Sequence, residues 1–407
     1  MNKSLLVVAL TLGFAGFAQA ESSVTLFGLV DAGYGFNQTE TKFSGASTGK
    51  VRVRSNGMQD SVMGGSHWGL TGEEDLGNGT SAIFALESGF NLSDGTKDDE
   101  DRLFGNQAIV GLSGDSWGTF TIGRDTSVAD EFVVPMDPFG TDGGFASAGS
   151  IFGTSLSETY DGTIKYMSPD FNGFQFGLGL VHSDSEKKTT VGNKQYKETN
   201  RHAGVTSGLG FESGPLYIGA SFDYIDGKGK NDHPGAEDED NYRTKTKAWN
   251  IGATYDFDVV KLHLLYGGFS DGHVNPDNEL EDGIGFLAAN AIGGLEEIGL
   301  IDAEGFGGKG LRQHSWLAGL SAPVGDAGDL MFSYAGNTAK NKRWNKDVNV
   351  KSHNFGLGYN YNLSKRTSVY GVASYGWSEA KYRPANEPGT KAKTTATQAV
   401  VGLQHRF

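Results

Sequence analysis

The chain of 407 residues contains no cysteine, so no disulfide holds its fold together. After residues 5–17, no apolar run approaches the roughly 18 residues that a transmembrane helix needs. Proline is also scarce, with 9 residues, and basic residues are outnumbered, which leaves a net charge of −15. An acidic chain of this kind argues against nucleic acid as a partner.

Residues 1–20 have the pattern of a signal peptide. A basic start, Met1-Asn2-Lys3, precedes the apolar run Leu5 to Phe17 and the cleavage-type sequence Ala18-Gln19-Ala20. We therefore expect a signal peptide at 1–20 and one mature domain at 21–407. Loss of Lys3 with the signal peptide takes the net charge from −15 to −16.

Glycine and aromatic residues are abundant instead, at 62 residues and 11%, in a chain whose mean hydropathy is −0.37. This composition fits alternating strands better than helices. The end of the chain shows the alternation clearly. One parity carries Phe407, His405, Leu403, Val401 and Ala399, and the other carries Arg406, Gln404, Gly402, Val400 and Gln398. A period of two predicts a strand, and an aromatic terminus is typical of a barrel strand at a membrane interface.

Connections between alternating segments fall into two kinds. Seven are short and rich in turn-forming residues: 73–79, 113–118, 168–173, 212–215, 256–259, 325–329 and 362–366. Eight are long and polar: 37–62, 91–106, 125–158, 183–201, 227–244, 269–314, 335–351 and 378–393. Strict alternation of long and short connections predicts 16 strands.

The strands also have one apolar face, as in Trp316, Ala318, Leu320 and Ala322. A soluble sandwich would need a second sheet over each apolar face and would not explain the alternation of long and short connections. We therefore predict an all-β fold, a 16-stranded antiparallel transmembrane β-barrel. A barrel of this size is wide enough to leave a water-filled channel.

Several segments, in order, resemble one family. They are Val24 to Gly33 (VTLFGLVDAG), Trp68 to Gly77 (WGLTGEEDLG), Leu86 to Phe90 (LESGF), Phe104 to Ala108 (FGNQA), Gly118 to Arg124 (GTFTIGR), Leu363 to Thr367 (LSKRT) and His405-Arg406-Phe407. Over essentially the whole mature chain the sequence resembles the trimeric general-diffusion porins of Gram-negative outer membranes, especially the beta-proteobacterial type.

The resemblance implies a homotrimer in the outer membrane, in contact with its lipid and lipopolysaccharide. Each barrel would fold its third loop inward to narrow the pore and would pass ions and small hydrophilic solutes by passive diffusion. Phe407 would be the assembly signal read by the barrel assembly machinery. No cofactor is implied.

The predicted third loop, Asp125 to Glu158, carries several acidic residues, Asp130, Glu131, Asp137 and Asp142. Taken alone, the residues fit equally well a solvated external loop and a loop that lines the lumen. The resemblance favours the lumen, where carboxylates opposite wall bases set up a field that selects ions.

On the wall, the chain departs from the family pattern. His67, Thr71, Ser81 and Thr159 stand where the family often has basic residues, and parity places them inward together with Lys165 and Glu87. The remaining basic candidates are Arg52, Arg54, Arg124 and Lys165. Arg124 has the parity of a lipid-facing residue, but it could also lie where the strand ends at loop three or at a trimer interface.

We therefore predict a constriction formed by Asp130, Glu131, Asp137, Asp142, Glu87, His67, Arg124 and Lys165. With basic positions lost and a net charge of −16 after removal of Lys3, the pore is predicted to be less anion-selective than its relatives and to prefer cations.

Two other features leave alternatives open. The acidic runs 98–101 and 237–240 could hold divalent cations that bridge lipopolysaccharide, although solvated charge runs are the commoner case. Residues 279–304 have helical spacing and could cover the pore mouth, contact a neighbouring subunit or, as we favour, form a short helix on the rim of their own barrel.

No G-x-S-x-G, H-E-x-x-H or P-loop motif occurs, so we do not predict an enzyme. The alternative function is a substrate-selective channel for sugars or peptides on the same barrel. Such a channel would need a ladder of aromatic residues along the lumen, and Phe27, Phe139 and Tyr370 do not form a convincing one.

Overall fold

The computed structural model describes residues 23–99, 101–140, 144–232, 243–271, 284–300, 306, 309–341, 347–383 and 388–407. The predicted signal peptide lies outside the described residues. No helix within these ranges is long and apolar enough to cross a membrane.

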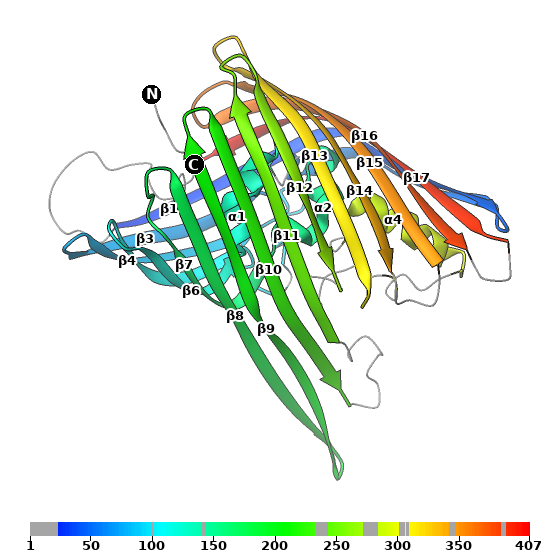
Figure 1. Cartoon of the computed structure of the whole chain (residues 1–407), viewed down its shortest axis with the longest axis horizontal. Coiled ribbons are helices and arrows are strands. Elements are labelled where there is room, and N and C mark those ends of the chain that lie inside the picture. Colours follow the sequence, from blue (N-terminus) through cyan, green and yellow to red (C-terminus); the bar gives the residue numbers. More distant parts are fainter. Residues whose placement is uncertain are drawn as a thin grey trace.

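Strands dominate the fold. They are β1 (Ser23–Gly45), β2 (Gly49–Asp60), β3 (His67–Gly77), β4 (Thr80–Gly89), β5 (Gln107–Gly114), β6 (Gly118–Thr126), β7 (Thr159–Met167), β8 (Phe174–Val191), β9 (Lys194–Ser213), β10 (Leu216–Asn231), β11 (Arg243–Asp256), β12 (Lys261–Ser270), β13 (Leu311–Val324), β14 (Gly328–Asn341), β15 (Asp347–Asn362), β16 (Thr367–Arg383) and β17 (Thr390–Arg406). Figure 1 shows them as one tilted wall around a few short helices.

From β3 onward each strand pairs antiparallel with the next, β1 pairs with both β2 and β3, and β17 pairs with β1, so the sheet closes on itself. The 17 labelled strands occupy 16 positions in the barrel, because β2 and β3 both pair with the same side of β1. Segment 61–66 separates these two strands and lies opposite Val30 and Asp31. The predicted 16-stranded antiparallel barrel is confirmed. Closure leaves no unpaired edge in lipid, where unsatisfied backbone groups are costly.

All seven predicted turns lie between consecutive strands at one end of the barrel. The predicted long connections lie at the other end, but several of them were predicted too long. Stretch 37–62 is largely the β1–β2 hairpin, and 183–201 is the β8–β9 hairpin that extends beyond the rest of the barrel in Figure 1. These segments are polar on both faces, so their sequence resembles that of a loop. They still form strands, because a strand outside the bilayer needs no apolar face.

Alternation along the strands separates an apolar outer face from a polar inner one. In β17, Val401 is 67% exposed while its neighbour Val400 is 4% exposed. Leu178, Leu264 and Leu320 likewise lie on the exposed outer face of their strands. In a transmembrane barrel this exposed apolar surface faces lipid, and the opposite parity lines the interior.

The inward carboxylate of Asp31 holds the break between β2 and β3. One of its oxygens accepts hydrogen bonds from Val62 N (3.2 Å) and the Tyr370 hydroxyl, and the other from Met63 N (3.1 Å) and Gln404 Nε2 (3.2 Å). Asp31 is fully buried, so it ties segment 61–66 to β1, β16 and β17 without help from solvent.

Replacing Asp31 with Ala should destabilise the barrel by about 3 kcal/mol or more, because several buried donors lose their acceptor at roughly 1–3 kcal/mol each. The measurement is the temperature at which the folded band disappears in a heat-modifiability gel. Asp326→Ala, in an exposed turn, is the matched control. Equal melting of the two variants would contradict this role for Asp31.

Candidate functional site

The third loop, between β6 and β7, lies inside the barrel. It contains α1 (Val128–Phe132), η2 (Val134–Met136), η3 (Gly144–Ala146), α2 (Gly149–Phe152) and η4 (Gly153–Ser155). Figure 1 shows these short helices surrounded by the strands. Val128, Phe132 and Met136 are almost fully buried. The third loop is therefore folded inward, as predicted.

Glycines on the inner wall allow the third loop to lie close against it. A Cβ at Gly210 would lie 2.7 Å from the Phe132 ring, and one at Gly219 only 2.2 Å from the Phe132 carbonyl oxygen. Gly252 lies against Met136 in the same way, and Gly358 against Phe139. These inner-wall glycines therefore allow the close approach between wall and loop.

Wall side chains satisfy the backbone of the third loop, since its polar groups have no sheet partner of their own. Hydrogen bonds join Val128 N to Thr206 (2.7 Å), Phe132 O to Tyr217 (3.0 Å), Met136 O to His263 (3.1 Å), Ser155 O to Asn250 (2.6 Å), Ile151 O to Gln313 (3.1 Å) and Asn337 (2.7 Å), and Ala146 O to Ser333 (2.9 Å). Six strands, β9 to β14, take part, so the loop is fixed along most of its length.

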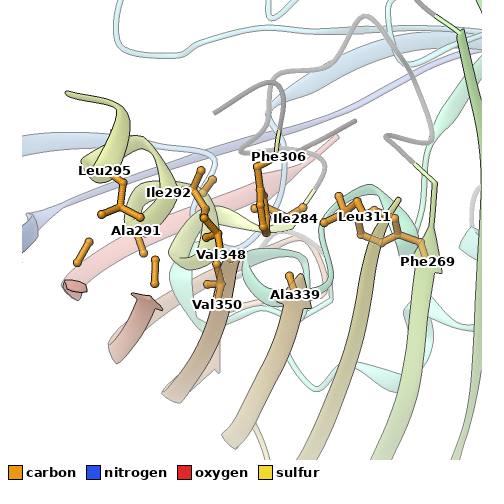
Figure 2. Close-up of a cluster of buried hydrophobic side chains, with 14 of the residues drawn as sticks. Phe269, Ile284, Ala291, Ile292, Leu295, Phe306, Leu311, Ala339, Val348 and Val350 are labelled. Carbon is orange, nitrogen blue, oxygen red and sulfur yellow. The ribbon is translucent and has the colours of Figure 1, made fainter. Parts of the chain in front are cut away.

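A second segment also enters the barrel, from the connection between β12 and β13. Its helix α4 (Phe286–Glu297) falls within the predicted helical stretch 279–304 and packs on its own barrel, against the inner face of β15 to β17 near their long-loop ends. Figure 2 shows Ala291, Ile292 and Leu295 of α4 beside Val348 and Val350 of β15, in one buried apolar cluster. The inner wall is apolar where it meets this helix, so wall and helix match.

The helix α4 rests on the third loop. The Phe286 ring stacks on Phe145 with centroids 4.3 Å apart. The buried side chain of Asn337 donates to Ile151 O of the third loop (2.7 Å) and to Ile284 O just before α4 (3.1 Å). One wall side chain therefore clamps both inward segments.

Carboxylates outnumber bases where the third loop leaves the wall. Lys165 Nζ lies 2.9 Å from Asp125 Oδ2 and 3.9 Å from Glu131 Oε1. Asp125 also accepts from Gln107 (2.9 Å), and Asp130 accepts from Ser157 Oγ (2.8 Å). Because Asp125 already compensates the charge of Lys165, Glu131 brings a further negative charge to this cluster.

Burial raises the pKa of Glu131 above that of a free glutamate. Lys165 opposes this effect, while the negative charges of Asp130 and Asp125 add to it. Glu131 therefore takes up a proton at a higher pH than an exposed glutamate does. Its side chain is still 33% exposed, so it can meet a permeating ion.

His67 and Glu87 lie on neighbouring strands, on the lumen-facing parity. His67 Nδ1 is 2.7 Å from Gly65 O and 4.0 Å from Glu87 Oε1, and Asn106 Nδ2 donates to Glu87 (2.9 Å). Both side chains are partly exposed, in keeping with a water-filled interior.

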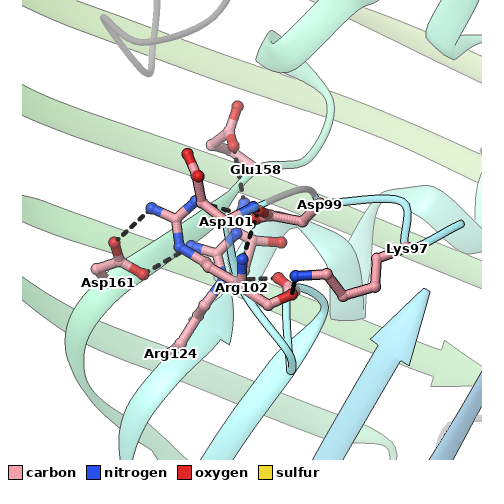
Figure 3. A network of polar contacts seen from close by, with 9 residues as sticks. Lys97, Asp99, Asp101, Arg102, Arg124, Glu158 and Asp161 are labelled. Carbon is pink, nitrogen blue, oxygen red and sulfur yellow. Dashed lines mark hydrogen bonds and ion pairs between the residues drawn. The ribbon is translucent and has the colours of Figure 1, made fainter. Parts of the chain in front are cut away.

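Arg124 lies on the opposite face of β6, with the exposed residues Phe120 and Ile122. Its guanidinium donates to Gly105 O (2.6 Å) and pairs with Asp161 (2.7 Å), which Arg102 also contacts (3.2 Å) (Figure 3). The structure thus groups Arg124 with the connection between β4 and β5, not with the carboxylates around Lys165.

A β-bulge explains why Thr159 does not face the lumen as predicted. The pairing of β6 with β7 shifts between Gly123 and Asp125, and Gly162 has a φ of 63°. Parity reverses at this bulge, so Tyr160 is buried inside and Asp161 turns to the outer face. The sequence shows no signal for the bulge beyond the glycine itself.

The remaining residues considered for the constriction have structural roles, face outward or lie outside the described residues. Asp137 is buried and accepts hydrogen bonds from Phe139 N (3.0 Å) and Ala148 N, which shapes the third loop. Arg52 faces outward and donates to Glu40 (2.6 Å). Asp142 lies outside the described residues.

A family model described as Gram-negative porin matches residues 5–381. The chain belongs to the Gram-negative porin family. An outer membrane porin protein of Bordetella pertussis is 37% identical over 414 residues, covering 100% of both chains. Outer membrane porin protein 32 of Delftia acidovorans is 28% identical over 424 residues, again covering 100% of both.

Solved structures agree with the fold. An anion-selective porin from Comamonas acidovorans has a TM-score of 0.60 at 24% identity, covering 95% of this chain and 100% of that one. A trimer form of OmpT from Vibrio cholerae has a TM-score of 0.51 at 11% identity, covering 95% and 99%. The chain is an outer-membrane porin, a channel-forming β-barrel of a family whose members are channels rather than enzymes.

Sequence reasoning missed three parts of this porin's interior. It treated Asp125 only as the boundary of the third loop. It did not predict that inner-wall glycines contact this loop, or that the amide side chains of Asn250, Gln313 and Asn337 hydrogen-bond to its backbone. The alternation of the strands places these three amide side chains inward. It does not show whether an inward amide hydrogen-bonds to water in the lumen or to the backbone of a loop.

Replacing Gly219 with Ala should push α1 away from β10 into the open lumen, because the new Cβ would meet the Phe132 carbonyl at 2.2 Å. We expect lower single-channel conductance and a destabilisation of about 1–3 kcal/mol. Gly371→Ala is the matched control, since its Cβ finds no atom closer than 3.9 Å. Unchanged conductance in the Gly219→Ala variant would show that the contact between Gly219 and the third loop does not set the width of the pore.

The β12–β13 segment can be removed cleanly, because its ends meet. Asp271 N donates to Leu311 O (2.9 Å) and Gly310 N to Asp271 Oδ1 (3.2 Å). Replacing residues 272–309 by an Asn-Gly turn should leave a folded barrel with a wider mouth and higher conductance in planar bilayers.

The control for this deletion is a shortened β8–β9 hairpin without residues 186–198, because that hairpin lies beyond the barrel wall. It should conduct as the unaltered porin does. Equal conductance of the 272–309 deletion and the unaltered porin would mean that α4 does not narrow the path.

Proposed function

We propose that this porin is a general-diffusion channel for small hydrophilic solutes that prefers cations over anions. The excess of carboxylates around Lys165 is the observation that carries the proposal. Asp125 compensates the lysine at 2.9 Å, and Glu131 at 3.9 Å adds a further negative charge that stays partly exposed. A cation passing Glu131 is attracted, and Lys165, the base that contacts Glu131, is already paired with Asp125.

The charges on the inner wall from β3 to β7 also favour cations over anions. Its lumen-facing positions carry Glu73, Asp75, Glu87 and Asp125, against Lys165 and His67. Arg52, Arg54 and Arg124, the other bases considered from sequence, face outward. A basic ladder opposite the third loop would be needed for anion selection, and these positions do not supply one.

A homotrimer is the assembly that we propose. The wall from β3 to β7 is low, with strands of 8 to 11 residues, whereas β8 to β10 have 16 to 20. Val24, Leu26 and Val110 are strongly exposed on the outside of β1 and β5, next to or within this wall. A low apolar wall suits contact with other subunits rather than with the full thickness of a bilayer.

Recognition of Phe407 by the assembly machinery stays a prediction from the family resemblance. A substrate-selective channel is not favoured, because Phe139 and Tyr370 are buried together in an apolar cluster instead of lining an open path.

Acidification should reduce the cation preference, because Glu131 is protonated at a higher pH than an exposed glutamate. The sign follows from the raised pKa: the negative charge is present above that pKa and is lost as the pH falls through it. The measurement is the reversal potential across a salt gradient, taken from pH 7.5 downward.

Glu131→Gln should lower the cation-to-anion permeability ratio at neutral pH and flatten its pH dependence. Glu186→Gln, on the projecting β8–β9 hairpin, removes the same charge outside the lumen and should leave the ratio unchanged. If Glu131→Gln keeps the permeability ratio of the unaltered porin, the proposed role of this carboxylate is wrong.

A further inference from the structure

Three apolar side chains interrupt the polar inner face of the wall on β1, β4 and β5. Phe27, Ala85 and Ile109 have lumen-facing parity, and each is partly exposed. We call these three residues the lumen patch. Inward positions of a channel-forming barrel are usually polar, because they border water. The lumen patch carries no charge, and none of the wall hydrogen bonds to the third loop described above involves it.

The three side chains lie on neighbouring strands. Ala85 of β4 and Ile109 of β5 are directly opposed in register, so their side chains are adjacent on the inner face. Phe27 of β1 reaches toward them across Gly69 of β3, where a Cβ would lie 2.5 Å from the Phe27 ring. Because glycine leaves that position without a side chain, the ring covers β3. The lumen patch is therefore a continuous apolar surface from β1 to β5.

Two carboxylates flank the lumen patch on the same inner face. Glu87 lies two residues from Ala85 on β4, and its side chain is 22% exposed. Glu73 of β3 is exposed and pairs in register with Ile83, which lies two residues from Ala85 on the other side. Directly opposed and diagonal side chains of a sheet are within reach of one another. A molecule on the lumen patch therefore meets a carboxylate on either side.

The nearest base on the neighbouring strands does not cancel these carboxylates. Lys165 lies on β7, two strands beyond Ile109, and its charge is compensated by Asp125 at 2.9 Å. His67 Nδ1 is 4.0 Å from Glu87, but an imidazole contributes a charge only when it is protonated. The surroundings of the lumen patch are therefore negative at neutral pH.

An apolar surface between carboxylates matches a molecule that combines an apolar group with a positive charge. The apolar group leaves water when it lies on Ala85 and Ile109. The Phe27 ring attracts an ammonium group through its π-face, and the carboxylates attract it by charge. An anion with the same apolar group is repelled, and a polar cation gains only the charge interaction.

We propose that the lumen patch, with Glu73 and Glu87, is a binding site for organic cations that carry an apolar group. Such a cation passes the porin more readily than a polar cation of the same size and charge. The inference rests on the proposed cation preference and adds to it a class of solute that a uniformly polar lumen does not favour.

The test compares two cations of equal charge and similar size, choline and propyltrimethylammonium, in which a hydroxyl group is exchanged for a methyl group. Reversal potentials in planar bilayers, with potassium on one side and either cation on the other, give the permeability of each. We expect propyltrimethylammonium to be the more permeant by about twofold or more, because its terminal methyl group leaves water at the lumen patch.

Ile109→Thr keeps the branched shape of the side chain but places a hydroxyl group in the lumen patch, so the permeability ratio of the two cations should fall toward one. Ala85→Ser, on the opposed strand, is a second variant with the same expectation. Val53→Thr is the matched control. Val53 faces inward on β2 and is 66% exposed, but its partner Thr39 lies near the other end of β1 from Phe27. This control should keep the ratio of the unaltered porin.

Three outcomes would overturn the proposal. They are equal permeability of the two cations in the unaltered porin, an unchanged ratio in both patch variants, and an equal fall of the ratio in the Val53→Thr control. Heat-modifiability gels confirm that each variant is folded.

The potassium-to-chloride permeability ratio separates this inference from the proposed ion preference. No charge changes in these variants, so that ratio should equal the ratio of the unaltered porin. A preference of the unaltered porin for chloride would contradict the proposed cation preference, whereas the comparison of the two organic cations would still decide whether the lumen patch favours apolar groups.

Discussion

Every backbone N–H and C=O inside this barrel needs a partner, and this requirement shapes both the wall and the channel. In the wall the strands satisfy one another, and closure of β17 on β1 removes the last edge. The third loop has no such ladder, so amide, hydroxyl and imidazole side chains from β9 to β14 hydrogen-bond to its backbone. The loop that sets the pore is therefore part of the wall's hydrogen bonding.

Close approach between loop and wall depends on glycine. At Gly210 and Gly219 the wall has no side chain, and the ring and the carbonyl group of Phe132 take its place. Helix α4 adds a second layer by a different means, because apolar residues such as Val348 and Val350 meet its buried face. Asn337 donates to both layers, so the two inward segments are held in fixed relation to each other.

Local patterns predicted the barrel well, because a period of two and the spacing of turns are properties of adjacent residues. The strand number, the closing strand and the inward third loop all followed from these patterns or from the family resemblance. The interior was harder to predict. The outward Arg124 and the inward Tyr160 depend on a bulge between Gly123 and Asp125, and the pairing of Lys165 with Asp125 joins residues whose proximity the sequence does not state.

The central claim is that the carboxylates left in excess around Lys165 set the charge preference of the pore. The reversal potential of the unaltered porin in a planar bilayer, with a tenfold potassium chloride gradient at neutral pH, tests it most directly. The account predicts the sign of a cation-preferring channel. A reversal potential of the opposite sign would contradict it.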